Sequence, residues 1–146
     1  MSALLESRKA LPGCRPNPPV GCVIVLEDRV VSRGFTGSPG TPHAEAAAIA
    51  ALAPAESGVS LSVFVTLEPC SFQGRTPSCA VALINRGVRS VFVGIVDPDP
   101  RNNGKGLQLL REAGIHVELG TLEHEIREFL APYLHGASQT AAQQPS

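Results

Sequence analysis

Residues 61–119 read LSVFVTLEPCSFQGRTPSCAVALINRGVRSVFVGIVDPDPRNNGKGLQLLREAGIHVEL, and this stretch sets the architecture of the chain. Two apolar runs rich in valine and phenylalanine, residues 61–67 and 90–96, are typical of buried strands. A helix over 104–113 separates the second run from a short strand at 115–119. Because a helical crossover joins parallel neighbours, we expect the last two strands to be parallel.

The sequence before this stretch predicts a hairpin and a helix. Residues 20–26 and 29–35 are apolar, β-branched runs joined by a two-residue turn, which predicts an antiparallel pair. An alanine-rich helix follows from His43 to about Ala53. In chain order, the expected elements are a helix at 3–10, the hairpin strands, the helix from His43, a strand at 61–67, a helix to Asn85 capped by Thr76 or Ser78, a strand at 90–96, a helix at 104–113, a strand at 115–119 and a helix at 123–130. This order predicts a three-layer α/β/α sandwich around a mixed five-stranded sheet.

The length and composition are those of one globular domain. The chain has 146 residues, of which 43% are hydrophobic, enough for a single core. From residue 132 onward the sequence is rich in alanine, glutamine and serine. We therefore expect a folded domain over 1–131 and a flexible tail over 132–146.

Charge and hydropathy argue against several classes of protein. Lys plus Arg number 12 and Asp plus Glu number 13, so the net charge of −1 offers no basic excess for a nucleic-acid backbone. The first nine residues carry charges where a signal peptide needs an apolar run, and no window has the length and apolarity of a membrane span. We therefore expect a cytoplasmic protein whose cysteines are reduced thiols or metal ligands.

Three residues with metal-binding side chains stand at the ends of predicted elements. Cys70 follows a strand, whereas His43 and Cys79 lie in the first turns of helices, whose positive ends favour thiolates. One imidazole and two thiolates suit zinc. Three protein ligands leave the fourth tetrahedral position open to water, as in catalytic zinc sites. The sequence therefore predicts one zinc ion per chain.

Glu45 is the candidate for acid–base chemistry at this site. It lies two residues after His43, where a carboxylate could move a proton from the water to a leaving amine. The alternative interpretation is a chance His-x-Glu triplet, with the cysteines acting as small buried hydrophobes. Together, however, the triplet, the Pro-Cys dipeptide and the second cysteine match the zinc-deaminase signature, except that eight residues rather than two separate the cysteines. The combination favours the zinc site.

Over nearly its whole length the chain resembles the pyrimidine deaminase domain of bacterial riboflavin biosynthesis, within the cytidine-deaminase-like superfamily. The matching segments are Pro16-Asn17-Pro18, Val20 to Val25, Pro42-His43-Ala44-Glu45, Thr66 to Ser71, Gly74-Arg75-Thr76-Pro77, Asp97-Pro98 and Gly104 to Leu107. The long loop between the two cysteines, with its Gly-Arg-Thr-Pro sequence, is specific to that branch. The resemblance implies a cytidine-deaminase-like fold and zinc-dependent hydrolytic deamination. The substrate it implies is the diaminohydroxyphosphoribosylaminopyrimidine intermediate of riboflavin biosynthesis.

The resemblance also implies roles for individual residues. It assigns zinc binding to the histidine and the two cysteines named above, and proton transfer to Glu45. Asn17 would hydrogen-bond the pyrimidine. Arg75 and Asp97 fall where the family contacts the ribosylamino phosphate side of its substrate, and a guanidinium suits phosphate through bidentate hydrogen bonds.

Asp99 departs from the family pattern. It follows Pro98 where the family usually has a neutral asparagine, so it places an acid near the expected phosphate. Like charges there repel unless the neighbouring cations, Arg101 and Lys105, offset the acid. Asp99 therefore joins the residues expected to affect substrate binding.

Two alternative functions stay open at this point. The chain could be a stand-alone paralogue that deaminates another aminopyrimidine or a purine-like base, or a catalytically idle, zinc-stabilised partner subunit. The reductase half that commonly follows this domain is expected to be absent. The near-neutral charge and the lack of tryptophan argue against a nucleic-acid editor. The expected partners are a small aminopyrimidine and further copies of the chain in a homodimer or larger assembly, with neither nucleic acid nor membrane.

Overall fold

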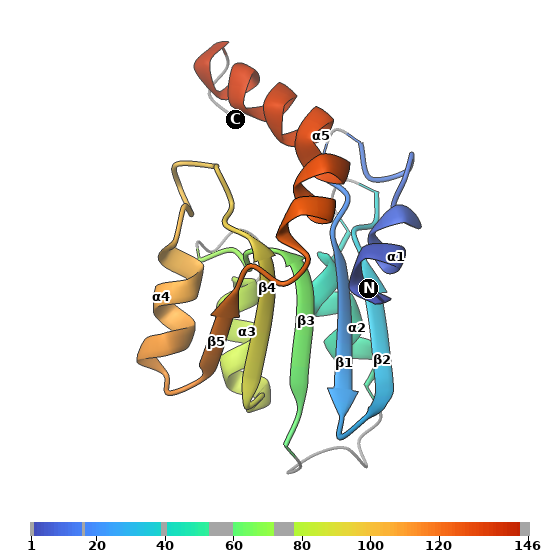
Figure 1. The fold of residues 1–146 in the computed structure, drawn as a ribbon, viewed down its shortest axis with the longest axis vertical. Helices are drawn as coiled ribbons and strands as arrows, with labels where there is room; N and C mark the ends of the chain where they lie inside the picture. The colour runs from blue at the N-terminus through green and yellow to red at the C-terminus, as the bar shows by residue number, and fades with distance from the viewer. Residues whose placement is uncertain (1, 16, 39–40, 53–59, 72–77, 144–146) are drawn as a thin grey trace.

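The computed structural model describes residues 2–15, 17–38, 41–52, 60–71 and 78–143. In chain order its elements are α1 (Ser2–Arg8), β1 (Gly21–Leu26), β2 (Arg29–Phe35), α2 (Ala44–Ala51), β3 (Ser62–Leu67), α3 (Cys79–Arg86), β4 (Ser90–Ile95), α4 (Lys105–Glu112), β5 (His116–Leu119) and α5 (Glu123–Gln143). Every predicted helix and strand is present in the predicted order. Within the described residues the strands form one five-stranded sheet of order β2-β1-β3-β4-β5 (Figure 1).

The sheet is mixed, as predicted. Strand β1 pairs antiparallel with β2 through the hairpin and antiparallel with β3 on its other side. Strand β4 pairs parallel with β3 and with β5. The helices α3 and α4 make the two crossovers between these parallel strands. Because the crossovers bring consecutive parallel strands side by side, the loops after β3 and β4 lie at the same edge of the sheet.

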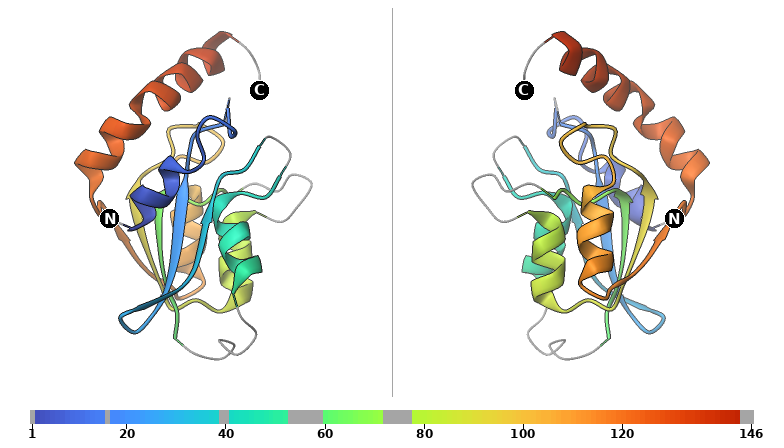
Figure 2. Two further views of the ribbon diagram at one scale, coloured as in Figure 1. Left: turned by 90° about the vertical axis from the view of Figure 1, so that its right-hand side faces the viewer. Right: turned by 90° about the vertical axis from the view of Figure 1, so that its left-hand side faces the viewer.

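Helices cover both faces of the sheet, which confirms the three-layer sandwich. Figure 2 shows α2, α3 and α4 on one face and α1 and α5 on the other. The larger hydrophobic cluster joins α2, α3 and α4 to the sheet through residues such as Ala48, Leu83 and Leu110. A second cluster, with Leu4 from α1 and Ile126 from α5, lies on the opposite face. The sheet is therefore buried from both sides near its centre.

Helix α2 packs against β2 at a glycine. A Cβ on Gly34 would overlap the carbonyl oxygen of Ala44 and lie 2.6 Å from the backbone nitrogen of Ala48. The hydroxyl of Ser32 donates a hydrogen bond to the Ala48 carbonyl, at 2.5 Å. Since α2 begins directly after His43, this close contact fixes the position of the histidine relative to the sheet.

We expect Gly34→Ala to destabilise the fold. The new methyl group would force α2 away from β2, and overpacking of this kind costs about 1–3 kcal/mol of the free energy of unfolding. Chemical denaturation of the two proteins measures the difference. Gly13→Ala is the control, because a Cβ there would meet its nearest atom, the Ala10 carbonyl oxygen, at an ordinary 3.7 Å. Equal stability of the Gly34→Ala variant and wild type would contradict the close packing of α2.

Helix α5 is longer than the sequence predicts. It runs to Gln143, whereas the predicted helix stops at Leu130, before Pro132. A proline inside a helix removes one backbone donor, which usually favours a break. The residues beyond it, rich in alanine and glutamine, are good helix formers, and the helix continues on both sides of the proline. Among the described residues, no helix combines the length and the apolar character needed to cross a bilayer.

Candidate metal centre

The three predicted metal-binding side chains meet at one edge of the sheet. His43 is the N-cap of α2, Cys70 follows the end of β3, and Cys79 is the first residue of α3. His43 Nδ1 lies 3.3 Å from Cys79 Sγ and 3.9 Å from Cys70 Sγ. One donor atom from each residue lies within 4.8 Å of the others. The fold thus brings His43 together with Cys70 and Cys79, which lie 27 and 36 positions further along the chain.

These distances suit a tetrahedral zinc ion. Zinc bonds of about 2.0–2.1 Å to nitrogen and about 2.3 Å to sulfur, at tetrahedral angles, separate the donor atoms by about 3.6–3.8 Å. The two separations from His43 Nδ1 fall close to this range. His43 is exposed while Cys79 is buried, so the donor cluster extends from the core to the surface. The residues present therefore fit the ion that the sequence predicts.

The N-terminus of α3 holds Cys70 in place. The backbone N–H of Cys79 donates to Cys70 Sγ at 3.2 Å, and that of Ala80 donates to the Cys70 carbonyl at 3.0 Å. Ser78 caps the same helix, because its hydroxyl accepts the N–H of Val81 at 3.1 Å. This satisfies the first three N–H groups of α3, which have no partner within the helix. Of the two predicted caps, Ser78 is confirmed and Thr76 lies outside the described residues.

The local charges favour a thiolate at Cys70. Its pKa is lowered to about 4, chiefly because the Cys79 thiol hydrogen-bonds to it, with a further contribution from the His43 imidazole. The same pairing, together with burial, raises the pKa of Cys79. The hydrogen bond with Cys70 raises the pKa of His43. The thiolate is the form of a cysteine that binds a metal ion, so the lowered pKa of Cys70 suits its predicted role as a ligand.

His43 differs slightly from its predicted position. The sequence places it in the first turn of the helix, whereas it is the residue before the first turn, with an extended backbone. Its side chain makes no capping hydrogen bond to α2. The imidazole is directed to the two cysteines instead, so tertiary contacts and not local capping decide its orientation.

Glu45 is buried in the first turn of α2, beside the donor cluster. It is 4% exposed, and burial raises its pKa to about 7. The carboxyl group interacts with the Cys79 thiol, which places it next to the expected ion. A carboxyl group with a pKa near neutrality can both take up and release a proton under ordinary conditions.

The remaining two cysteines belong to the interior. Cys14 and Cys22 are fully buried, and burial raises the pKa of both thiols. All four cysteines of the chain are free thiols in the structure. Cys22 is part of the larger hydrophobic cluster.

The predicted substrate contacts are described only in part. Arg75 lies outside the described residues. Asn17 is half-buried in the loop before β1, where its backbone N–H donates to the Cys14 carbonyl at 2.8 Å. Its contact with a pyrimidine stays a prediction.

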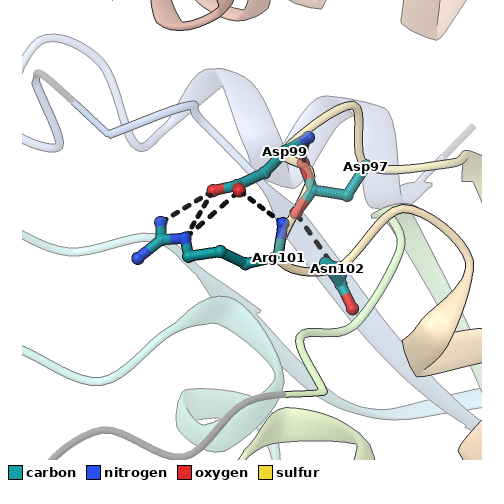
Figure 3. Close-up of polar contacts among 4 residues, drawn as sticks. All are labelled: Asp97, Asp99, Arg101 and Asn102. Carbon is teal, nitrogen blue, oxygen red and sulfur yellow. Dashed lines mark hydrogen bonds and ion pairs between the residues drawn. The ribbon is translucent and has the colours of Figure 1, made fainter. Parts of the chain in front are cut away.

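In the loop after β4, Asp97 and Asp99 each accept the backbone N–H of the residue two positions later through their side chains (Figure 3). Asp97 Oδ1 accepts the N–H of Asp99 at 3.0 Å, and Asp97 Oδ2 accepts from Asn102 Nδ2 at 3.4 Å. Burial raises the pKa of Asp97. The Asp97 carboxylate therefore holds the conformation of this loop through hydrogen bonds within the loop. A contact between Asp97 and the substrate would be a second role.

Asp99 is paired with a cation. Arg101 Nη2 lies 2.7 Å from Asp99 Oδ2, and Arg101 Nε lies 3.1 Å from Oδ1 (Figure 3). This forked ion pair lowers the pKa of Asp99. Of the two cations expected to offset the acid, Arg101 does so. The loop therefore presents a compensated charge and not an unopposed carboxylate.

Two buried polar residues near the centre escape prediction from sequence alone. Glu68, two residues before Cys70, is 3% exposed, and Asn102 is fully buried. Both make side-chain hydrogen bonds to backbone groups about 30 residues away or more. The signal in the sequence is the placement of an acid between a buried strand and the Pro-Cys dipeptide. That signal gives no partner for the acid.

A protein-family model described as the cytidine and deoxycytidylate deaminase zinc-binding region matches residues 1–95. Among curated proteins, the riboflavin biosynthesis protein RibD of Chlamydia pneumoniae is 48% identical over 120 residues, which are 82% of this chain and 31% of that protein. The residues that the family model matches include His43, Cys70 and Cys79.

Solved structures show the same similarity. A structure of Acinetobacter baumannii RibD has a TM-score of 0.85 at 40% identity and covers 92% of this chain and 37% of that one. A diaminohydroxyphosphoribosylaminopyrimidine deaminase/5-amino-6-(5-phosphoribosylamino)uracil reductase from Thermotoga maritima has a TM-score of 0.88 at 36% identity, covering 95% of this chain and 40% of that one. The chain thus spans between about a third and two fifths of the length of these relatives.

Proposed function

Because the chain belongs to the family of zinc-dependent cytidine and deoxycytidylate deaminases, we propose that it hydrolytically deaminates an aminopyrimidine of riboflavin biosynthesis. The proposed substrate is the diaminohydroxyphosphoribosylaminopyrimidine that names the Thermotoga maritima relative. One observation carries the proposal: His43, Cys70 and Cys79 converge to within 4.8 Å, next to the buried carboxyl group of Glu45. Purely structural zinc sites use four protein ligands and need no such acid.

We assign zinc binding to the imidazole of His43 and the thiolates of Cys70 and Cys79. A zinc ion held there supplies an activated water at neutral pH. Glu45 takes a proton from the attacking water and delivers it to the departing amino group. The ring carbon exchanges its C–N bond for a C–O bond, and the nitrogen leaves as ammonia. Burial of Glu45 keeps the proton transfer away from bulk solvent.

The phosphate of the substrate would bind near the loop after β4. We assign this role to Arg75, with Asp97 on the same side and Asn17 at the ring. The pair between Asp99 and Arg101 supports the assignment, because it removes the repulsion that an unpaired acid would exert on phosphate. The alternative of another aminopyrimidine or purine-like base is tested by comparing phosphorylated and unphosphorylated substrates.

We expect Arg75→Ala to raise KM for the phosphorylated substrate far more than for its dephosphorylated form. Only the phosphorylated form loses a charge-assisted contact, which is worth about 1.5–3 kcal/mol, or roughly a 10- to 100-fold change in KM. Asp99→Asn should act in the opposite direction, because it removes the negative charge and the acceptor that hold Arg101. Steady-state kinetics on both substrates measure these changes. An equal change in both KM values would exclude the phosphate contact.

The assembly and the location in the cell stay predictions from the sequence. A homodimer or larger oligomer and a cytoplasmic protein are the states that we propose for this chain.

A further inference from the structure

The segment Glu68-Pro69-Cys70, which α3 holds through Cys70, is also held by the N-terminus of α4. Glu68 Oε1 accepts the backbone N–H of Asp97 at 3.0 Å and that of Gly104 at 2.9 Å. Glu68 Oε2 accepts the backbone N–H of Leu107 at 3.1 Å. Glu68 is 3% exposed, so these three hydrogen bonds are shielded from water. Two of them, from Gly104 and Leu107, occupy N–H groups at the start of α4 that have no partner within the helix, and the third holds the loop after β4.

Pro69, between Glu68 and Cys70, is fixed as well. Asn102 Nδ2 donates to the Pro69 carbonyl at 3.1 Å, while Asn102 Oδ1 accepts the N–H of Gly106 at 3.1 Å. Gly106 lies so close that a Cβ there would overlap the Pro69 carbonyl oxygen. The backbone immediately before Cys70 therefore has little freedom to move.

We propose that Glu68 is a positioning residue for the metal centre. It fixes the direction of the Cys70 side chain by tying the end of β3 to the N-terminus of α4. The inference rests on the role of Cys70 as a zinc ligand proposed above. Because Glu68 also binds the N–H of Asp97, the same carboxylate holds the loop that we expect to face the substrate. Groups that orient a metal ligand typically change metal affinity about 10- to 100-fold when they are altered.

Glu68→Gln is the direct test. Glutamine has nearly the same size but one acceptor oxygen, so at least one of the three buried N–H groups would face its NH₂ group. We expect the zinc Kd to rise about 10- to 100-fold, measured by competition with a chromogenic chelator on protein shown to be folded by circular dichroism. Glu68→Asp keeps the charge and both oxygens but is one methylene shorter. It should raise the zinc Kd in the same direction, and it serves in place of the glutamine variant should that variant not fold.

Two controls separate positioning from a general loss of stability. Glu6→Gln alters another buried carboxylate, which lies on α1 and pairs with Lys9 at 2.7 Å. Gly114→Ala strains the backbone just beyond α4, at a φ of 86°, and so lowers stability without touching the segment. Both controls should bind zinc with the wild-type Kd.

The outcomes distinguish this inference from the proposed function. Wild-type zinc binding with a raised Kd in the Glu68 variants, and not in the controls, supports the positioning role. A Kd in the Glu68 variants equal to that of the controls overturns it. A folded wild-type chain that binds no zinc overturns the ligand assignment itself.

Discussion

Replacing Glu45 by glutamine should lower kcat by about 10²- to 10⁴-fold, the contribution typical of a general acid–base group. Glutamine fills the same space beside Cys79 but can neither take up nor release a proton near neutral pH. The Glu45 side chain is 4% exposed, so bulk water has poor access to take over the proton transfer in the variant. Steady-state measurement of ammonia release from wild type and variant, each loaded with zinc, gives the ratio.

The metal content of the Glu45→Gln variant is the matched control. Glu45 is not one of the three assigned ligands, so the variant should keep one zinc per chain and the wild-type fold. Normal turnover by the zinc-loaded variant would show that Glu45 does not move the proton. Loss of zinc would instead mean that the carboxylate takes part in metal binding.

Cys79→Ser should lower zinc affinity more than any change to a residue that only orients a ligand, that is, by more than about 100-fold. A serine hydroxyl stays protonated at neutral pH and is a poor zinc ligand, whereas the Cys79 sulfur lies 3.3 Å from His43 Nδ1. Metal binding energy is partly folding energy, so the melting temperature should fall together with the zinc content. Metal analysis and thermal unfolding of the purified variant measure both quantities.

A second cysteine provides the control for this experiment. Cys14→Ser makes the same change at a buried thiol that is not part of the donor cluster. It should keep one zinc per chain. Full zinc occupancy in Cys79→Ser would remove Cys79 from the ligand set.

The fold follows from the sequence because its signals are local. The apolar runs predict β3 and β4 as strands, the helical crossover before β5 predicts the parallel pair of β4 and β5, and the two-residue turn predicts the hairpin. The end of α5 is the exception, since the good helix formers after Pro132 outweigh the single donor that the proline removes.

The candidate metal centre is predictable because its residues have distinctive side chains at the ends of elements. Imidazole and thiol groups at helix starts and a strand end indicate zinc without knowledge of the fold, and the fold brings them together. The residues that hold the backbone around the metal centre in place are not predictable in this way. Glu68 and the Asn102 amide nitrogen bind backbone groups 29 to 39 positions distant, and a polar residue in a loop gives no sign of such partners. The forked pair of Asp99 and Arg101 likewise depends on the loop geometry.

Ammonia release by the purified, zinc-loaded chain tests the account most directly. The substrates would be the diaminohydroxyphosphoribosylaminopyrimidine, its dephosphorylated form and a panel of other aminopyrimidines and purine-like bases. We expect stoichiometric ammonia from the phosphorylated compound, loss of activity after chelation of the metal and recovery when zinc is restored. Preferred turnover of an unphosphorylated base would contradict the riboflavin substrate, and a folded, zinc-loaded chain that releases ammonia from none of these compounds would contradict the deaminase itself.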